Sequence, residues 1–233
     1  MNKTVVFTLF FAYSAITAQT TNHTIDSVVT AAFNASDISV LQAFYDAEKG
    51  TLPYQKAYLK YRMANVYGIK KQDSEGKKAL EEAMFIIENQ KEKNDEDWVL
   101  LALIQNNLIK FSSFVKAPFE SMQVSEYLEN AEKINSSNPR LYYVKALQDM
   151  YTPAMFGGGK KAEEYFKKAI SLYSKVTDGN ELLWGYEDTY INLIKFYVKE
   201  KRTTDAKQVF YKGVALFPRS DWFKRNKVVI EKL

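Results

Sequence analysis

Apolar residues recur at helical spacing along most of this chain, most clearly between residues 190 and 218. One predicted helix has a shared face made of Tyr190, Leu193 and Tyr197. A second predicted helix has a shared face made of Ala206, Phe210 and Gly213. Residues three or four positions apart are neighbours on a helix, so each set forms one stripe. The polar run 203–205 separates the two helices, and Pro218 ends the second because proline cannot continue a helix.

Small residues in the second stripe indicate how the two helices pack. Ala206 and Gly213 let the backbones approach closely, and Phe210 fills the space between them. The order and spacing resemble the tetratricopeptide repeat (TPR), whose second helix carries alanine and phenylalanine before a proline. Tyr190 stands where that repeat usually has tryptophan. The resemblance implies an all-α fold, a right-handed α-α superhelix or TPR-like solenoid of about four helical pairs with flanking helices.

Three earlier helix pairs repeat the pattern. The first is expected at 53–67 and 74–91, and the packing residues of its second helix are Ala79, Ala83 and Ile86. The second pair starts at residue 95 and resumes at residue 125 after an insertion, with packing residues Tyr127, Ala131 and Ile134. The third starts at residue 139, and its second helix carries Ala162, Phe166 and Ala169. The expected organisation is a signal peptide at 1–18, a helical cap at 19–52, TPR-like repeats at 53–219 and a capping helix at 220–233.

Two segments lie outside this pattern. Residues 112–122 form an insertion in which Pro118 indicates a loop, and three phenylalanines lie close by, Phe111, Phe114 and Phe119. Either this insertion folds back on the repeats or it offers an apolar patch to a partner. Folding back is expected, because exposed phenylalanine lowers solubility. The capping helix is expected to dock through Trp222, Phe223, Val229 and Ile230.

The N-terminus has the composition of a secretory signal peptide. Lys3 is followed by an apolar run from Val5 to Tyr13 and then by small residues, so cleavage is expected near Ala18. A membrane span needs about 20 apolar residues, so the run is short for one. An uncleaved anchor and a buried first helix are the alternatives. The mature protein is therefore expected in the periplasm or the medium, with no stable membrane span.

The amino-acid composition excludes several classes of catalytic and metal-binding site. Aromatic residues make up 15% of the 233 residues, while glycine and proline number only 9 and 5, which suits packed helices joined by short turns. The chain has no cysteine and one histidine, His23, so thiolate sites, serine triads and zinc sites are not expected. The net charge of +4 comes from interspersed charges without a basic block, which argues against a nucleic-acid partner.

Two sequence features that could indicate a binding or catalytic site are better explained by a structural role. The run 157–160, Gly-Gly-Gly-Lys, lacks the first glycine and the hydroxyl residue of a phosphate-binding loop, so it indicates a wide turn between helices. The neighbouring glutamates at 81–82 and 163–164 are expected to face solvent, and nothing marks them as an acid and base pair. No cofactor, metal or catalytic residue is assigned, so the chain is not expected to be an enzyme.

The inner wall of the implied solenoid is the remaining candidate site, because the first helix of each pair lines it. By resemblance, the expected partner-binding residues are Tyr58, Tyr61, Asn65, Asn106, Gln148, Tyr151, Lys195 and Lys199, beside Val99, Leu103, Val144 and Ile191. Tyrosine, amide and lysine side chains suit an extended peptide. The expected function is an exported scaffold that binds a protein or peptide in the cell envelope. The alternative is a glycan-binding or carrier module of an envelope uptake system, because tyrosine also stacks on sugar rings.

Overall fold

The computed structural model describes residues 24–47, 52–176 and 184–233, and every regular element within these ranges is a helix. The predicted signal peptide and His23 lie outside the described residues. The chain forms two compact units, one that ends at Asn89 and one that runs from Gln90 to Val176 and from Trp184 to Leu233. Within the described ranges, no helix is long and apolar enough to cross a membrane.

The described part of the first unit contains one helical pair and the helices before it. Its helical stretches are residues 24–35, α2 (Ser39–Ala47), α3 (Pro53–Ile69) and α4 (Asp73–Glu88). α3 packs against α4, and α2 packs against α3. Leu59, Met63 and Leu80 are almost inaccessible to solvent, so the core of this unit lies between α3 and α4.

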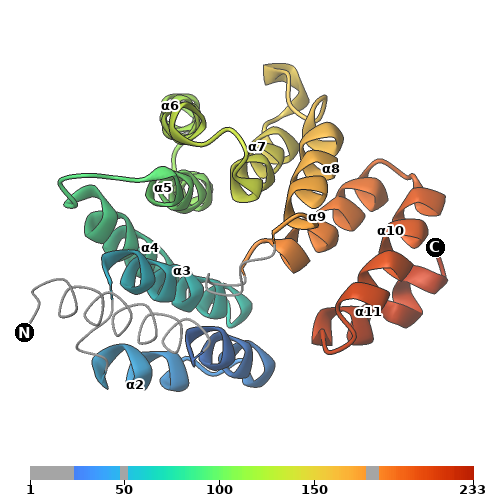
Figure 1. Ribbon diagram of the computed structural model, residues 1–233, viewed down its shortest axis with the longest axis horizontal. Helices are drawn as coiled ribbons and strands as arrows, with labels where there is room; N and C mark the ends of the chain where they lie inside the picture. The colour runs from blue at the N-terminus through green and yellow to red at the C-terminus, as the bar shows by residue number, and fades with distance from the viewer. Residues whose placement is uncertain (1–23, 48–51, 177–183) are drawn as a thin grey trace, which may run out of the picture. The chain divides into compact units, whose positions relative to one another are not determined.

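The second unit continues the alternation of first and second helices. Its elements are α5 (Asp95–Leu108), the 3-10 turn η1 (Ile109–Phe111), α6 (Ala117–Ile134), α7 (Pro139–Tyr151), the 3-10 turn η2 (Ala154–Phe156), α8 (Ala162–Tyr173), α9 (Tyr186–Lys199), α10 (Thr203–Leu216) and α11 (Asp221–Glu231). α5 packs on α6, α7 on α8 and α9 on α10, and α7 also contacts α5, α6 and α9 (Figure 1). Together with α3 and α4, these helices give the four predicted pairs.

Polar side chains and prolines fix where several helices start. Asn94 accepts a hydrogen bond from the backbone N–H of Asp97 (2.9 Å), and the Asp97 carboxylate accepts one from the N–H of Asn94 (3.1 Å). This reciprocal pair satisfies two amides at the start of α5. Asn138 caps α7 by accepting from the N–H of Arg140 at 2.8 Å. Prolines occupy the first turns of α3, α6 and α7, where a missing N–H costs no hydrogen bond.

The turns inside the first and last pairs have the same backbone geometry. Lys71, between α3 and α4, and Lys201, between α9 and α10, have positive φ angles of 57° and 59°. The N–H of the residue after each lysine donates to a tyrosine carbonyl, Tyr67 at 2.9 Å and Tyr197 at 2.8 Å. These are the bonds of a helix C-terminus that is closed by a left-handed residue. The internal repeat is therefore present in the backbone as well as in the sequence.

These equivalent turns set the register between α4 and α10. Counted from the positive-φ lysine, the stripe Ala206, Phe210 and Gly213 corresponds to Gly76, Leu80 and Ala83, and all six residues are buried. The predicted alignment with Ala79, Ala83 and Ile86 was therefore wrong by three residues. Ala83 is common to both alignments, and Ile86 is only half-buried. Each register places a small residue at its first position, Ala79 in one and Gly76 in the other, so spacing alone did not choose between them.

α6 differs from its prediction in where it starts and in the exposure of one predicted packing residue. It begins at Ala117, so Pro118 lies in the first helical turn and not in a loop. Proline is accepted there because the first N–H groups of a helix have no intrahelical acceptor. Tyr127 and Ala131 are buried as predicted, together with Val124 and Leu128, whereas Ile134, also predicted to pack, is 54% exposed.

α11 covers α10 through Phe223 and Trp222, and the ring centroid of Trp222 lies 6.4 Å from that of Phe210. Phe223 is 2% exposed, and its ring lies 5.5 Å from that of Phe210. A Cβ on Gly213 would lie 2.2 Å from the Phe223 ring, so the glycine makes room for this contact. Ile230 is also buried, but Val229 is 59% exposed, so its predicted docking role was wrong.

Candidate functional site

Three of the predicted partner-binding residues lie on α3 in the first unit. Tyr58 and Tyr61 are 2% and 7% exposed, and their ring centroids lie 6.5 Å apart. Asn65 is half-buried. The two tyrosines therefore belong to the packed interior and offer little surface to a partner.

Three more predicted residues lie on α5 and α7 in the second unit. Asn106 is half-buried. Gln148 donates hydrogen bonds to the carbonyl oxygen of Ser121 at 2.9 Å and to the hydroxyl of Ser125 at 2.8 Å, which ties α7 to α6. Tyr151, at the end of α7, is 61% exposed. Of these three, Tyr151 has the largest surface available for a contact.

The two predicted lysines on α9 differ in their surroundings. Lys199 donates a hydrogen bond to the carbonyl oxygen of Met150 at 3.0 Å, which satisfies an acceptor at the end of α7. Lys195 keeps an exposed side chain, yet surrounding protein lowers its pKa, and the Asp188 carboxylate opposes that shift.

The apolar residues expected beside these candidates do not line a free surface. They are Val99, Leu103, Val144 and Ile191, and all four are buried. Their predicted place on the inner wall was therefore wrong, because they pack between helices. Among the predicted set, all but Tyr58 and Tyr61 are exposed or half-buried, and their part in binding stays a prediction.

Large apolar side chains gather with their surfaces in water around the start of α6 and η2. This set, here called the Phe114 patch, consists of Phe114, Val115, Phe119, Met122, Met155 and Phe156, and their exposed fractions run from 53% to 78%. The ring centroids of Phe114 and Phe156 lie 6.5 Å apart, which brings the two segments together. The expectation that residues 112–122 fold back on the repeats was therefore wrong. The sequence offered the alternative of an apolar patch, but it did not show that η2 contributes to it.

The turn that follows η2 is fixed by three glycines. Gly157 and Gly159 have φ angles of 89° and 81°, which favour glycine. A Cβ on Gly158 would lie 2.0 Å from the carbonyl oxygen of Thr152. The N–H of Gly159 donates to the carbonyl oxygen of Asp149 at 2.8 Å and closes the turn. Local backbone geometry therefore holds η2 in one position beside the start of α6.

Asp149 completes this turn with its carboxylate. The carboxylate accepts hydrogen bonds from the N–H groups of Lys161 at 2.9 Å and Ala162 at 2.8 Å. These are amides at the start of α8, which would otherwise attract an anion. Because Asp149 already occupies them, the Gly-Gly-Gly-Lys run is a structural turn, as predicted.

A groove of 450 Å³ lies beside the Phe114 patch and is lined by residues of α6, α7, α8 and the glycine turn. Phe156 belongs to both the patch and the groove. The polar side chains of the groove largely satisfy one another, since Lys145 pairs with Glu132 at 2.8 Å and Gln148 bonds the serines of α6. The groove is therefore a polar surface that lies next to the Phe114 patch.

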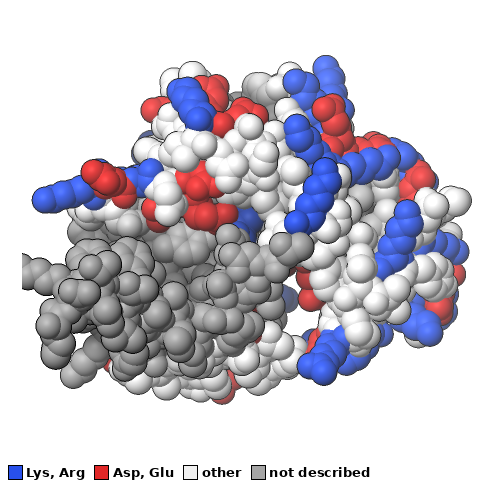
Figure 2. Space-filling view, viewed as in Figure 1, with Lys and Arg blue, Asp and Glu red and all other residues white. Residues whose placement is uncertain are grey.

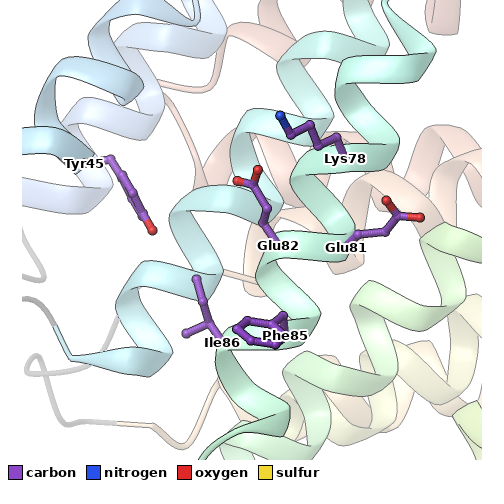
Figure 3. Close-up of a pocket in the computed structure, with 6 residues that line it drawn as sticks. All are labelled: Tyr45, Lys78, Glu81, Glu82, Phe85 and Ile86. Carbon is purple, nitrogen blue, oxygen red and sulfur yellow. The ribbon is translucent and has the colours of Figure 1, made fainter.

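The first unit has a shallow pocket of 460 Å³ between α2 and α4 (Figure 3). Tyr45 extends from α2 towards Phe85 and Ile86 on α4, and Phe85 is 67% exposed. Glu82 also lines the pocket, and it pairs with Lys60 at 2.7 Å. Phe85 is thus an exposed phenylalanine outside the Phe114 patch, which makes it a useful control position.

Glu163 is the most strongly perturbed carboxyl group in the described residues. It accepts hydrogen bonds from Arg202, from Lys167 at 2.7 Å and from Tyr197 at 2.9 Å, and so joins α8 to the turn between α9 and α10. The bond from Arg202, followed by that from Lys167, lowers the pKa of Glu163 to about 2. The sequence prediction that this glutamate only faces solvent was wrong. Its partners are structural, because they hold neighbouring helices together.

Charged side chains of both signs are distributed over most of the surface, and near the Phe114 patch they include the exposed Glu126 and Glu129 of α6. Figure 2 shows lysine and arginine interspersed with acidic side chains over the visible face of the described residues. The segments 108–122 and 151–161 contain four exposed lysines, Lys110, Lys116, Lys160 and Lys161. Their one acidic residue, Glu120, accepts a hydrogen bond from Ser112. In the part of the chain that the structure describes, no cluster of histidine, aspartate and glutamate could hold a metal ion.

Comparison with known proteins establishes the fold. No family model and no curated protein matches the sequence. The structure is similar to that of TTC0263, a thermophilic TPR protein in Thermus thermophilus, with a TM-score of 0.56 and 12% identity, covering 91% of this chain and 100% of that one. It is also similar to the HusA haemophore from Porphyromonas gingivalis, with a TM-score of 0.54 and 22% identity, covering 76% of this chain and 92% of that one. The chain therefore has a TPR-like helical-repeat fold.

Proposed function

We propose that the protein is an exported, non-catalytic scaffold that binds a protein or peptide partner in the cell envelope, and that it binds through the Phe114 patch. The observation that carries the proposal is the set of six exposed apolar side chains on two segments of the second unit, which meet at the contact between Phe114 and Phe156. Exposed apolar side chains that cluster on a protein surface are typical of contact sites. The TPR-like fold supports a scaffold, because stacked repeats present an extended binding surface.

The rigidity of the patch also supports a binding role. Phe119 and Met122 project from a helix, and Met155 and Phe156 lie in a turn that is fixed by three glycines. Anchor residues held in place lose less conformational entropy when a partner binds. Tyr151, a predicted wall residue that is 61% exposed, precedes this turn and is proposed to extend the contact. Export is proposed from the signal-like sequence of residues 1–18.

Site-specific photo-crosslinking in the native host tests the proposal. A photoreactive amino acid at Phe119 should form a discrete crosslinked adduct with a partner, whereas the same amino acid at Phe85 should not. The two positions are matched, because these phenylalanines are 71% and 67% exposed. Equal adducts from both positions, or none from Phe119, would contradict the proposal.

A carrier of a flat, largely apolar ligand is the second candidate, and the ligand class is haem. The structural similarity to the HusA haemophore suggests it, and the composition of the patch favours it. Phenylalanine and methionine can cover a porphyrin face, and lysines such as Lys116 and Lys160 can pair with its carboxylates. Tyr151 and Met155 carry atoms that can ligate iron.

Haemin titration distinguishes this carrier function from the scaffold function. A carrier should give a saturable shift of the Soret absorbance with one haemin per chain, and Phe119→Ser should weaken it. Phe85→Ser should leave the titration unchanged. If both variants titrate like the wild type, or if haemin binds without saturation, the carrier function is rejected. A glycan array tests the predicted sugar-binding alternative in the same two variants.

A further inference from the structure

The groove next to the Phe114 patch has the size of a small-molecule site. Its volume of 450 Å³ lies within the range of about 300–1,000 Å³ that is typical of such sites. α6, α7, α8 and the glycine turn all contribute to it, and most of the side chains that line it are polar or charged. The groups that the protein's own contacts leave available therefore decide which ligand the groove suits.

The charges of the groove nearly cancel. Its acidic residues are Glu129, Glu132 and Asp149, and its basic residues are Lys145 and Lys161. Glu132 pairs with Lys145 at 2.8 Å. The Asp149 carboxylate accepts two N–H groups at the start of α8, where the helix dipole also offsets its charge. Glu129 and Lys161 remain, and they carry opposite signs, so the groove favours a neutral ligand over an anion or a cation.

Both donors and acceptors in the groove remain available to a ligand. The two backbone N–H groups that bind Asp149 both contact Oδ2, so Oδ1 is available to accept a hydrogen bond. Gln148 donates from Nε2 to α6, which leaves its Oε1 available. Within the described residues, no hydrogen bond engages the Lys161 ammonium or the Tyr165 hydroxyl. A ligand hydroxyl both donates and accepts, so a ligand with several hydroxyls matches this mixture.

Tyr165 supplies an aromatic ring to the groove. It is half-buried, its ring centroid lies 6.4 Å from that of Tyr142, and the ammonium of Lys145 lies 6.0 Å from it. These two neighbours belong to α7 and hold the ring in place. A sugar ring has a face of C–H groups that packs on an aromatic side chain while its hydroxyls bond the polar groups around it. An acyclic polyol has no such face, so the ring of Tyr165 favours a sugar.

From the volume, the charge balance, the open hydrogen-bonding groups and the Tyr165 ring, we propose that this groove binds a neutral sugar unit of a glycan. The sugar packs on Tyr165, and its hydroxyls bond Asp149, Gln148 and Lys161. The proposal assigns a defined place to the sugar-binding alternative that the sequence raised. It does not depend on the scaffold function, because Phe156 is the one residue that the groove shares with the Phe114 patch.

Calorimetry with trisaccharides on the full chain tests the proposal. The neutral probes are maltotriose, cellotriose, mannotriose and chitotriose, the acidic probe is trigalacturonate, and the basic probe is the glucosamine trimer. At least one neutral probe should bind with one site per chain. Each charged probe should bind at least about tenfold more weakly than that neutral probe. A charged probe that binds equally well would overturn the charge argument and the proposal with it.

Two matched pairs of substitutions locate the site. Tyr165→Leu should weaken the neutral probe by about tenfold, whereas Tyr165→Phe keeps the ring and should retain more of the affinity. Lys161→Met should also weaken it by about tenfold, because a hydrogen bond from a charged donor is lost. Lys160→Met, at the exposed neighbouring lysine outside the groove, should bind like the wild type. Lys161 is exposed, so its variant should keep the wild-type circular dichroism spectrum even if Tyr165→Leu does not fold.

Three results would overturn the proposal without touching the scaffold function. The first is that none of the six probes binds the wild type, and the second is that folded Lys161→Met binds like the wild type. The third is that Phe119→Ser loses the sugar while Lys161→Met and Tyr165→Leu keep it, which would place the sugar on the Phe114 patch. Discrete crosslinks from Phe119 support the scaffold function whichever of these results is obtained, so the two proposals fail separately.

Discussion

One added methyl group at Gly213 should destabilise the last helix pair. An ideal Cβ at this position would lie 2.2 Å from Cζ and 2.4 Å from Cε1 of Phe223. Phe223 is 2% exposed, and its ring centroid lies 5.5 Å from that of Phe210 and 6.1 Å from that of Phe217. The ring cannot move away from the methyl group without disturbing these two neighbours, so Gly213→Ala should strain the contact between α10 and α11.

The magnitude follows from two opposing effects. Overpacking a close-packed contact costs about 1–3 kcal/mol. Alanine has a higher helix propensity than glycine, which returns up to about 1 kcal/mol. Because the clash is severe, the net loss expected for Gly213→Ala is about 1–2 kcal/mol. For a chain of this length, that corresponds to a decrease of about 2–8 °C in Tm.

Gly68→Ala is the matched control for this substitution. Gly68 lies near the end of α3, and a Cβ there would meet nothing within 4 Å. The same change should therefore raise stability by up to about 1 kcal/mol. Differential scanning calorimetry gives both Tm values, and amide hydrogen exchange should accelerate in α10 and α11 of Gly213→Ala alone. A Gly213→Ala protein as stable as the Gly68→Ala protein would refute the packing of Phe223 over Gly213.

Three further predictions concern the second unit. The pKa of Glu163 is about 2 in the folded protein against an ordinary value of 4.5, so the stability it contributes is present above pH 4.5 and is lost as the pH falls towards 2. In urea titrations across that range, the wild type should lose stability on the order of 1–2 kcal/mol after solvent screening. Glu163→Gln should abolish this pH-dependent loss, whereas Glu164→Gln should retain it. Asp149→Ala should lower the urea midpoint by the equivalent of about 0.5–2 kcal/mol, because two N–H groups at the start of α8 lose their acceptor; an unchanged midpoint would show that the cap is dispensable. Gly158→Ala should displace the turn after η2 and weaken any ligand of the Phe114 patch, measured by anisotropy, and undiminished binding would show that the patch does not depend on this turn.

The helix pairs could be predicted from the sequence because their signals are local. Ala162, Phe166 and Ala169 repeat the spacing of Ala206, Phe210 and Gly213, and all six residues are buried as expected. Small residues at such positions indicate close packing of two helices, because a short side chain lets the two backbones approach each other closely. The fold class therefore follows from periodicity and from a few small residues.

The register of α4 and the start of α6 could not be predicted because the same residues fit two structures. Ala79 and Ala83 satisfy one alignment, while Gly76, Leu80 and Ala83 satisfy the one that the structure adopts. Pro118 is compatible with a loop and equally with a first helical turn. Local sequence does not decide between such alternatives, which depend on the packing of the neighbouring helix.

The candidate site was predicted less well than the fold because exposure is a tertiary property. Tyrosine is a residue type common at binding surfaces, but Tyr58 and Tyr61 are buried. Phenylalanine is typical of protein cores, but Phe114 and Phe119 are exposed. The contact between Phe114 and Phe156 joins segments about 40 positions apart, and no local spacing encodes it. The sequence did show that an apolar insertion was present, and this was the one available signal.

Hydrogen exchange on the complex isolated from the native host tests the central claim, that the Phe114 patch is the contact surface. The tagged protein is purified with its crosslink-identified partner, and amide exchange is compared with that of the free protein. Slower exchange in residues 114–122 and 151–161, with α3 and the remainder of the first unit unchanged, is the expected result. Protection confined to α3, or to α9 around Lys195, with none at the patch, would contradict the claim.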